Sequence, residues 1–416
     1  MPVHRIPGSA RGSVYALTEE LDAWLRQSET TEADGASETT AALPIERASS
    51  ARKWKAALFA AFLAVGFGIA VYAWPEARPP SRGGLVPSNS EAAALYVEAR
   101  ADWARRTPGS IAAAIDKLKR VVATEPQFAP AYSALADCYL LAREFGSLSD
   151  LEAFGRAQAA VDTALKIDPD HAGALRARGF IDYWWHGDRM AASRGFHHSL
   201  AINNKSAQTH FWFGNVLIDN GDFTEGMRHL AEAQLIEPAS AAIAADLAWA
   251  RWSAGEGERA KAELLELRRS NPALATIPDY LSVMALADGN MEGFVGEIET
   301  MAGQREEAAL SEQAQRLRAA MTDGPRAVAA IVVREAESEV EDGTRRTLTW
   351  PAFVASAAGK RADLLRLLRK ADARGETWGS AGLRRHIAER WRGDGEIGGL
   401  LERREPPLLV TGAKSS

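Results

Sequence analysis

The sequence predicts an all-α protein in which a solenoid of stacked helical hairpins follows one membrane-spanning helix and a small β-hairpin-helix head. Beyond Ser90, helix-length amphipathic segments alternate with turns rich in Gly, Pro, Asn and Asp, and no convincing strand pairs occur. Turn residues in this part recur at intervals of 34 residues. Nearer the N-terminus, the stretch from Ala56 to Trp74 contains no charged residue.

Composition limits the classes of protein to which the chain can belong. Its 416 residues exceed one ordinary domain, and a hydrophobic content of 46% is enough to form a core. The formal net charge of −6 disfavours a dedicated nucleic-acid-binding protein, which usually has a basic surplus. The single cysteine, Cys138, excludes an intrachain disulfide framework, and we expect it to be a small buried apolar residue.

Residues 1–27 are expected to form the head, with strands over 3–6 and 13–17, a glycine-rich turn between them and a helix after them. The motif V-H-R-x-P-G…G-S-V-Y-A-x-x-x-E-L-D-A-W-L resembles the wing hairpin and following helix of excisionase-like and MerR-like winged-helix DNA-binding domains. In those domains the recognition helix would lie before Val3. We therefore expect a truncated head that does not bind DNA as written, either because the domain has decayed or because the start codon lies upstream.

A transmembrane helix is expected over residues 54–74, between two linkers. The linker 28–53 is rich in Ser, Thr, Ala and Glu, and the linker 75–90 is rich in Pro. The nineteen uncharged residues from Ala56 would span about 28 Å at roughly 1.5 Å per residue, close to the ~30 Å of a bilayer core. A cleaved signal peptide is disfavoured because about fifty polar residues precede this stretch.

The flanks of this helix predict its orientation. Four basic residues lie in 46–55 and two in 75–84. By the positive-inside rule, the N-terminus is cytoplasmic and the large C-terminal part lies outside the cytoplasm. We expect a single-pass protein of a bacterial inner membrane with its repeats in the periplasm. The residues that form a small-residue stripe on the helix are Ala56, Ala60, Ala64 and Gly68. Such a stripe would let two helices dimerise, unless it only reflects the high alanine content.

The repeat region is recognised from its 34-residue spacing. Pro238 and Pro272 are 34 residues apart, as are Gly221 and Gly255. This spacing resembles that of the tetratricopeptide repeat family, and the resemblance extends over residues 91–272 in five units. It implies a right-handed solenoid of helix pairs A and B, in which Gly214 fills the small position where the two helices approach most closely. Several units are needed because each one covers the apolar face of its neighbour.

Some parts of the repeat region are irregular. An insertion of about nine residues is expected in the turn within residues 143–154, and the unit from Ala172 carries one extra turn residue. Residues 273–376 keep the helix-turn-helix rhythm without the family's characteristic residues, so divergent helical repeats are expected there. Residues 377–416 are expected to form capping helices and a loose tail, which begins at Pro406-Pro407.

Motifs for catalysis, cofactors and metals are missing or out of context. Gly255-Glu256-Gly257 followed by Ala260 matches a dinucleotide-binding pattern, but it lies between two helices instead of after a strand. Five of the eight histidines lie between His171 and His210, without the spacing typical of zinc ligands. We therefore expect no enzymatic activity, no cofactor and no metal site.

The remaining candidate is a binding surface. Tetratricopeptide arrays bind partners along a concave groove lined by helix A, and transferring that position to each unit selects seven residues. They are Arg176, Phe180, Tyr183, Phe211, Asn215, Trp249 and Trp252. Aromatic and arginine side chains dominate binding energy at interfaces, although some of these rings could instead pack between repeats.

The sequence thus predicts a membrane-anchored, non-enzymatic scaffold that binds a protein or peptide partner through its concave groove. The alternative is a membrane-tethered transcription regulator or signalling protein with a truncated DNA-binding head, in which the repeats act as the sensor. Fold alone supplies no catalytic site, which disfavours an enzyme.

Overall fold

The structure is a computed structural model, and the chain divides into two units, Met1–Arg78 and Pro79–Ser416, each described by itself. The described residues are 4–5, 14–15, 86–145, 148–305, 307–342, 345–377, 379–403, 405–407 and 409. In the first unit, β1 (His4–Arg5) pairs antiparallel with β2 (Val14–Tyr15), within the predicted strands. The remainder of the predicted head, the linker 28–53, the predicted span 54–74 and residues 75–85 lie outside the described residues. Among the helices that are described, none is both long and apolar enough to cross a bilayer.

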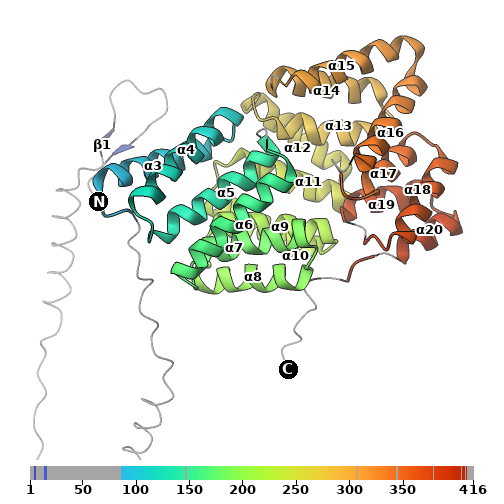
Figure 1. Cartoon of the computed structure of the whole chain (residues 1–416). Helices are drawn as coiled ribbons and strands as arrows, with labels where there is room; N and C mark the ends of the chain where they lie inside the picture. Colours follow the sequence, from blue (N-terminus) through green and yellow to red (C-terminus); the bar gives the residue numbers. More distant parts are fainter. Residues whose placement is uncertain are drawn as a thin grey trace, which may run out of the picture. The chain divides into compact units, whose positions relative to one another are not determined.

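The second unit is built from helical hairpins that follow one another along the chain (Figure 1). The first six pairs are α3 (Ser90–Ala104) with α4 (Pro108–Thr124), α5 (Ala129–Phe145) with α6 (Asp150–Ile167), α7 (Ala172–Ile181) with α8 (Arg189–Ile202), α9 (Ala207–Asn220) with α10 (Phe223–Ile236), α11 (Ala241–Ala254) with α12 (Gly257–Ser270), and α13 (Thr276–Ala287) with α14 (Met291–Arg305). The later helices are α15 (Ala308–Ala320), α16 (Pro325–Glu341), α17 (Thr349–Ala357), α18 (Arg361–Ala373), α19 (Ala381–Arg390) and α20 (Gly395–Glu402). The described residues of this unit are therefore all-α, as predicted.

Each hairpin packs against the next one. The second helix of one pair contacts the first helix of the following pair, from α4 on α5 to α14 on α15. Phe196 of α8 and Phe213 of α9, both fully buried, stack across one such junction with ring centroids 5.0 Å apart. Because a single hairpin would leave these apolar faces in water, the stacking of neighbours stabilises the array as a whole.

The α9–α10 pair shows why the repeat requires a small residue in its first helix. A Cβ atom added to Gly214 would lie 2.8 Å from Cγ of Leu230 and 3.0 Å from the carbonyl oxygen of Gly226. Gly214 and Gly226 therefore face each other where the two helices are closest. This contact confirms the role predicted for Gly214, because any side chain there would push the helices apart.

The turns between paired helices have a common construction. Gly221 and Gly255 end α9 and α11 in the left-handed region, with φ of 103° and 104°. Glycine adopts this conformation without steric cost, which explains its recurrence at the turn. At the other end, Ser206 and Ser240 cap the same two helices by accepting backbone N–H groups.

The two predicted irregularities take a different form. The extra residue after Ala172 is absorbed inside the helix, because α7 continues as a π-helical turn over Asp182–His186. The insertion expected in the turn within 143–154 mostly lengthens the helices instead. As a result α5 and α6 have 17 and 18 residues, whereas α9 and α10 have 14 each.

The C-terminal helices do more than cap the end of the array. Helix α19 packs on α17 and also returns to α9 and α11 (Figure 1). The expectation of a loose tail from Pro406 is wrong for the described residues. The amide of Asn220 donates to the carbonyl oxygen of Pro407 at 3.0 Å, and the backbone N–H of Leu409 donates to Asp222 at 3.0 Å. These bonds attach the tail to the α9–α10 turn.

We predict that Gly214→Ala destabilises the protein by about 1–3 kcal/mol, because the added methyl meets the backbone of Gly226. The matched control is Gly155→Ala on α6, where an added Cβ meets nothing within 4 Å. That variant should stabilise the protein by about 0.5–1 kcal/mol, because alanine is the better helix former. Chemical denaturation followed by circular dichroism measures both. Equal stabilisation by the two variants would contradict the close helix approach.

Candidate functional site

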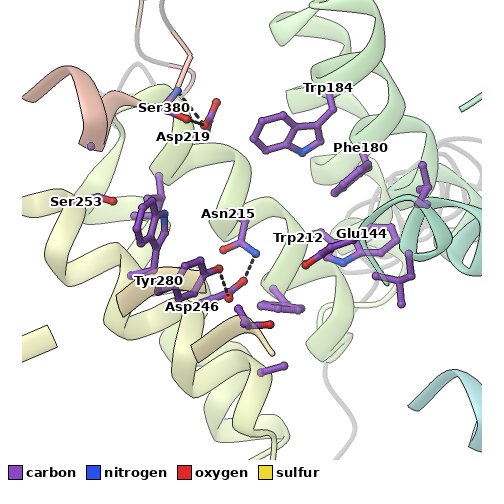
Figure 2. Close-up of a pocket in the computed structure, with 18 of the residues that line it drawn as sticks. Glu144, Phe180, Trp184, Trp212, Asn215, Asp219, Asp246, Ser253, Tyr280 and Ser380 are labelled. Carbon is purple, nitrogen blue, oxygen red and sulfur yellow. Dashed lines mark hydrogen bonds between the residues drawn. The ribbon is translucent and has the colours of Figure 1, made fainter. Parts of the chain in front are cut away.

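A cavity of about 230 Å³ lies among the first helices of successive hairpins. It is bounded by α5, α7, α9, α11 and α13, and by the start of α19. Its aromatic and polar lining includes Phe180, Trp184, Phe211, Trp212, Asn215, Asp219, Asp246, Trp249 and Tyr280. Figure 2 shows Phe180, Trp184 and Trp212 on one side, Tyr280 on the other, and Asn215 with Asp246 between them.

The walls of the cavity are aromatic. On one side the ring of Phe180 lies 4.7 Å from Trp212 and 6.1 Å from Trp184, measured between centroids. On the other side Trp249 stacks on Tyr280 at 4.7 Å with an interplanar angle of 20°. Because the rings on each side contact one another, they form two supported surfaces between which a side chain can be held.

Asp246 forms the polar floor between these walls. Its side chain accepts a hydrogen bond from the amide of Asn215 at 2.6 Å and another from the hydroxyl of Tyr280 at 2.7 Å. The residue is only 8% exposed. Burial raises the pKa of its carboxyl to about 6, and the two hydrogen bonds offset only part of this effect.

A second carboxylate, Asp219, joins the cavity to the C-terminal part of the chain. It accepts hydrogen bonds from the hydroxyl of Tyr183 at 2.8 Å and from the backbone N–H and hydroxyl of Ser380 at 2.9 and 3.0 Å. Burial raises the pKa of Asp219, and the bonds from Tyr183 and Ser380 act in the opposite direction. Asp219 therefore fixes the start of α19 against α9.

The π-helical turn Asp182–His186 explains how Trp184 reaches the cavity. Its wider turn changes the direction of the side chains that follow α7. Tyr183 contacts Asp219, Trp184 lines the cavity, and Trp185 stacks on Phe154 at 5.1 Å outside it. The carbonyl oxygen of Trp185 accepts a hydrogen bond from Arg346 at 2.6 Å.

The structure separates the seven sequence-predicted groove residues into two groups. Phe180, Phe211, Asn215 and Trp249 line the cavity. Arg176, Tyr183 and Trp252 do not, because their side chains are engaged in buried contacts. Arg176, 7% exposed, pairs with Asp137 and lies over the ring of Trp212 at 5.1 Å. Trp252, 2% exposed, stacks between Trp249 and His386. These three support the walls from behind, and the binding role of all seven stays a prediction.

Sequence reasoning missed several lining residues that the repeat period could have identified. Trp212, Asp246 and Tyr280 follow one another at intervals of 34 residues, on α9, α11 and α13. They occupy the same position of three successive units and meet in one cavity. Ser380 had no such signal, because it lies 161 residues from its partner Asp219.

Histidine and cysteine side chains are the other candidates for chemistry in the described part of the chain. There, no group of three or more His, Cys, Asp or Glu is arranged to hold a metal. His210 and His229 instead share a hydrogen bond between their Nδ1 atoms at 2.8 Å, and burial lowers the pKa of His229 to about 3. Cys138 is buried, as expected, and burial raises the pKa of its thiol.

Comparison with known families identifies part of the array. Residues 217–287 match the tetratricopeptide repeat family. The match covers the end of α9 through α13, which includes the helices that carry Asp246 and Tyr280. It also extends past Pro272, where only divergent repeats were expected. Residues 217–287 therefore match tetratricopeptide repeats, and the hairpins that contain these residues are their structural form.

Individual relatives are distant. The transcriptional regulator HilA of Salmonella typhimurium is 24% identical over 155 residues, which are 37% of this chain and 28% of HilA. The chain thus spans about a quarter of the length of the curated relatives it matches. Among solved structures, a thermophilic tetratricopeptide protein of Thermus thermophilus is 20% identical with a TM-score of 0.33, covering 39% of this chain and 81% of that one. Yeast Tom70 is 11% identical with a TM-score of 0.40, covering 78% and 61%.

The raised pKa of Asp246 predicts a pH-dependent stability. An unfolded aspartate has a pKa near 3.9, so the folded state binds the extra proton between about pH 4 and pH 6. The free energy of unfolding should therefore fall as pH rises through this window. Asp246→Asn removes the charge at this position. The new side-chain oxygen can still accept the hydrogen bond from Tyr280, and the new amide group can donate to Asn215 if the Asn215 amide turns over.

We expect Asp246→Asn to stabilise the protein by on the order of 1–3 kcal/mol at pH 7.5, and to have little effect near pH 3.5. Denaturation midpoints of both proteins at the two pH values measure this difference. A variant that is no more stable than the parent at pH 7.5 would contradict the claim that the buried charge of Asp246 destabilises the folded state.

Proposed function

We propose that this protein is a non-enzymatic scaffold that binds an extended segment of a protein partner in the concave groove of its repeats. The observation that carries the proposal is the cavity with two aromatic walls and a polar floor, in which Trp212, Asp246 and Tyr280 come from the same position of three successive repeats. Aromatic rings provide most of the binding energy at protein interfaces, and buried polar groups at their centre fix the orientation of the guest.

The cavity alone has room for a side chain, and it adjoins two larger hollows. Its volume of about 230 Å³ is below the roughly 300–1,000 Å³ of typical small-molecule sites. A second hollow of about 480 Å³ shares Arg106 and Ala242 with it, so the groove continues beyond the cavity. An extended segment with one anchoring side chain fits this arrangement.

The proposal includes membrane anchoring by residues 54–74, on the sequence pattern alone. The uncharged stretch and its basic flank support a single-pass topology with the repeats outside the cytoplasm. In that arrangement the scaffold would present its groove to extracytoplasmic partners next to the membrane. Self-association through Ala56, Ala60, Ala64 and Gly68 would place two grooves side by side.

A second candidate function is transcription regulation or signalling, with the repeats as the sensor region. The partial similarity to HilA, which is described as a transcriptional regulator, favours this interpretation. The β1–β2 pairing agrees with the wing-like hairpin that the head motif resembles. In the winged-helix domains that this hairpin resembles, the recognition helix would lie before Val3. The genomic sequence upstream of Met1 decides between the two functions, because an in-frame helix-turn-helix there would favour regulation.

We predict that the full-length chain, purified in a mild detergent, selects binding peptides from a displayed library of random 12-residue sequences. Trp249→Ala should weaken the selected peptides about tenfold or more, because it removes one stacked wall of the cavity. The matched control is Trp350→Ala on α17, a half-buried tryptophan that does not line the cavity. Fluorescence anisotropy measures the affinities. Equal losses in the two variants, or no selected peptide, would refute groove binding.

We predict that the chain stays in bacterial membranes during alkaline carbonate extraction. Leu63→Arg with Val65→Arg should release it, because each arginine at the centre of a span costs roughly 2.5–3.5 kcal/mol. Ala33→Arg with Ala36→Arg adds the same charge to the linker and should leave the protein in the membrane. Release of the parent chain by carbonate would rule out the anchor. Protection of the repeats from protease added to spheroplasts would show that they lie in the cytoplasm, opposite to the predicted orientation.

A further inference from the structure

We propose that the cavity receives a cationic side chain, arginine or lysine, from the extended partner segment, and that Asp246 is its counter-ion. This inference rests on the proposed groove binding and specifies its chemistry. It assigns a ligand class to a cavity whose floor is a single buried carboxylate.

The first argument is that Asp246 has no ion-pair partner among the described residues. Both of its hydrogen-bond donors, Asn215 and Tyr280, are neutral, and it forms no ion pair with any described residue. Asp137, which is equally buried on α5, provides a comparison within the same array. Its carboxylate is paired with the guanidinium of Arg176. A buried carboxylate without a cation is costly, so the cavity is prepared for a positive charge that the chain does not supply.

The second argument concerns the remaining acceptor capacity of the floor. Asn215 donates to Oδ2 of Asp246 and Tyr280 donates to Oδ1, so each oxygen has used one of its acceptor positions. An ionised carboxylate has about four such positions. Two are therefore left, one on each oxygen, which suits a guanidinium binding through two parallel bonds or an ammonium binding between them.

The third argument is the aromatic character of the walls. Cations are attracted to the faces of tryptophan and tyrosine rings, and the attraction is stronger where water is excluded. The chain already uses this contact beside the cavity, since the guanidinium of Arg176 lies 5.1 Å from the centre of the Trp212 ring. Phe180, Trp249 and Tyr280 offer further ring surface around the floor.

The other charges around the cavity are consistent with a cationic guest. Glu144 and Asp219 add two carboxylates to the lining. Arg106 and Arg143 also line it, and the guanidinium of Arg106 acts to lower the pKa of Asp246, against the larger effect of burial. Both arginines also have other partners. Arg106 lies over the rings of Trp103 and Phe211, at 5.2 and 5.5 Å. Arg143 lies over Phe154 at 5.3 Å and pairs with Asp150 at 3.8 Å. Glu144 forms no ion pair with a described residue; burial raises the pKa of its carboxyl, and Arg106 and Arg143 act in the opposite direction.

The test uses the full-length chain and peptides selected from the random library. We expect the selected peptides to carry arginine or lysine at a fixed position. Replacing arginine by citrulline, which keeps the length of the side chain, or lysine by norleucine, which keeps its carbon chain, removes the charge and should weaken binding at least tenfold. Asp246→Asn should cause a similar loss for the cationic peptide.

A double-mutant cycle then tests whether the two groups contact each other. On the Asp246→Asn protein, the citrulline or norleucine peptide should bind within about twofold of the cationic peptide, because their interaction is already lost. The matched control is Asp279→Asn, which removes a carboxylate from the same groove on α13 without touching the cavity lining. It should change affinity by less than about twofold. A higher melting temperature of Asp246→Asn at neutral pH excludes unfolding as the cause of its loss.

The outcomes separate the two proposals. Peptides that bind through Trp249 but lack a fixed cationic residue, or that bind Asp246→Asn as well as the parent, would overturn the cationic anchor and leave groove binding intact. Equal losses in Asp246→Asn and Asp279→Asn would show only a general effect of charge, and would also overturn it. Selection of no peptide would overturn both proposals.

Discussion

The array depends on a close approach between paired helices that each neighbouring pair then covers. At Gly214 and Gly226 the backbones of α9 and α10 lie too near for a side chain. This contact sets the angle between the helices, and the pair presents apolar faces that it cannot bury alone. Rings such as Phe196 and Phe213 fill the junction with the next pair. Since the outer faces are used for stacking, the inward-facing residues of the first helices can be polar or aromatic without loss of the core.

The residues that line the cavity follow from this arrangement, in which the outer faces of the helices stack and the inward-facing positions of the first helices do not. In the first helices α9, α11 and α13, one position holds Trp212, Asp246 and Tyr280. A carboxylate at such a position is neither stacked nor exposed, because the curvature of the array surrounds it with the neighbouring units. The resulting burial of Asp246 costs stability, which proteins tolerate mainly where a charge serves binding. The same carboxylate would lie in solvent on an isolated hairpin, so its special character arises only from the stacked array.

Sequence periodicity predicted the regular part of the fold well, and its physical basis is local. Gly221 and Gly255 indicated the turns because their left-handed conformation is accessible to glycine at little cost. Phe180, Asn215 and Trp249 were predicted to line the groove from the resemblance to tetratricopeptide arrays, and all three line the cavity. The period could not show that Arg176 is held by Asp137, or that Trp252 is covered by His386. Both contacts involve helices whose relative position is a property of packing. The π-helical turn at Asp182–His186 was predicted as a longer loop, because an extra residue has no sequence signal that tells a helix from a turn.

The C-terminal part determines whether the cavity is preformed. Asp219 holds Ser380, and His386 stacks on Trp252, which in turn stacks on Trp249 in the wall. Helix α19 therefore supports one wall from outside the repeats that build it. A flexible groove would lose binding energy to the ordering of its side chains, whereas supported rings lose little. The return of α19 onto α9 and α11 thus has a consequence that a simple end cap would lack. It makes the helices after residue 377 part of the support of the cavity around Asp246, although they contribute few of its lining residues.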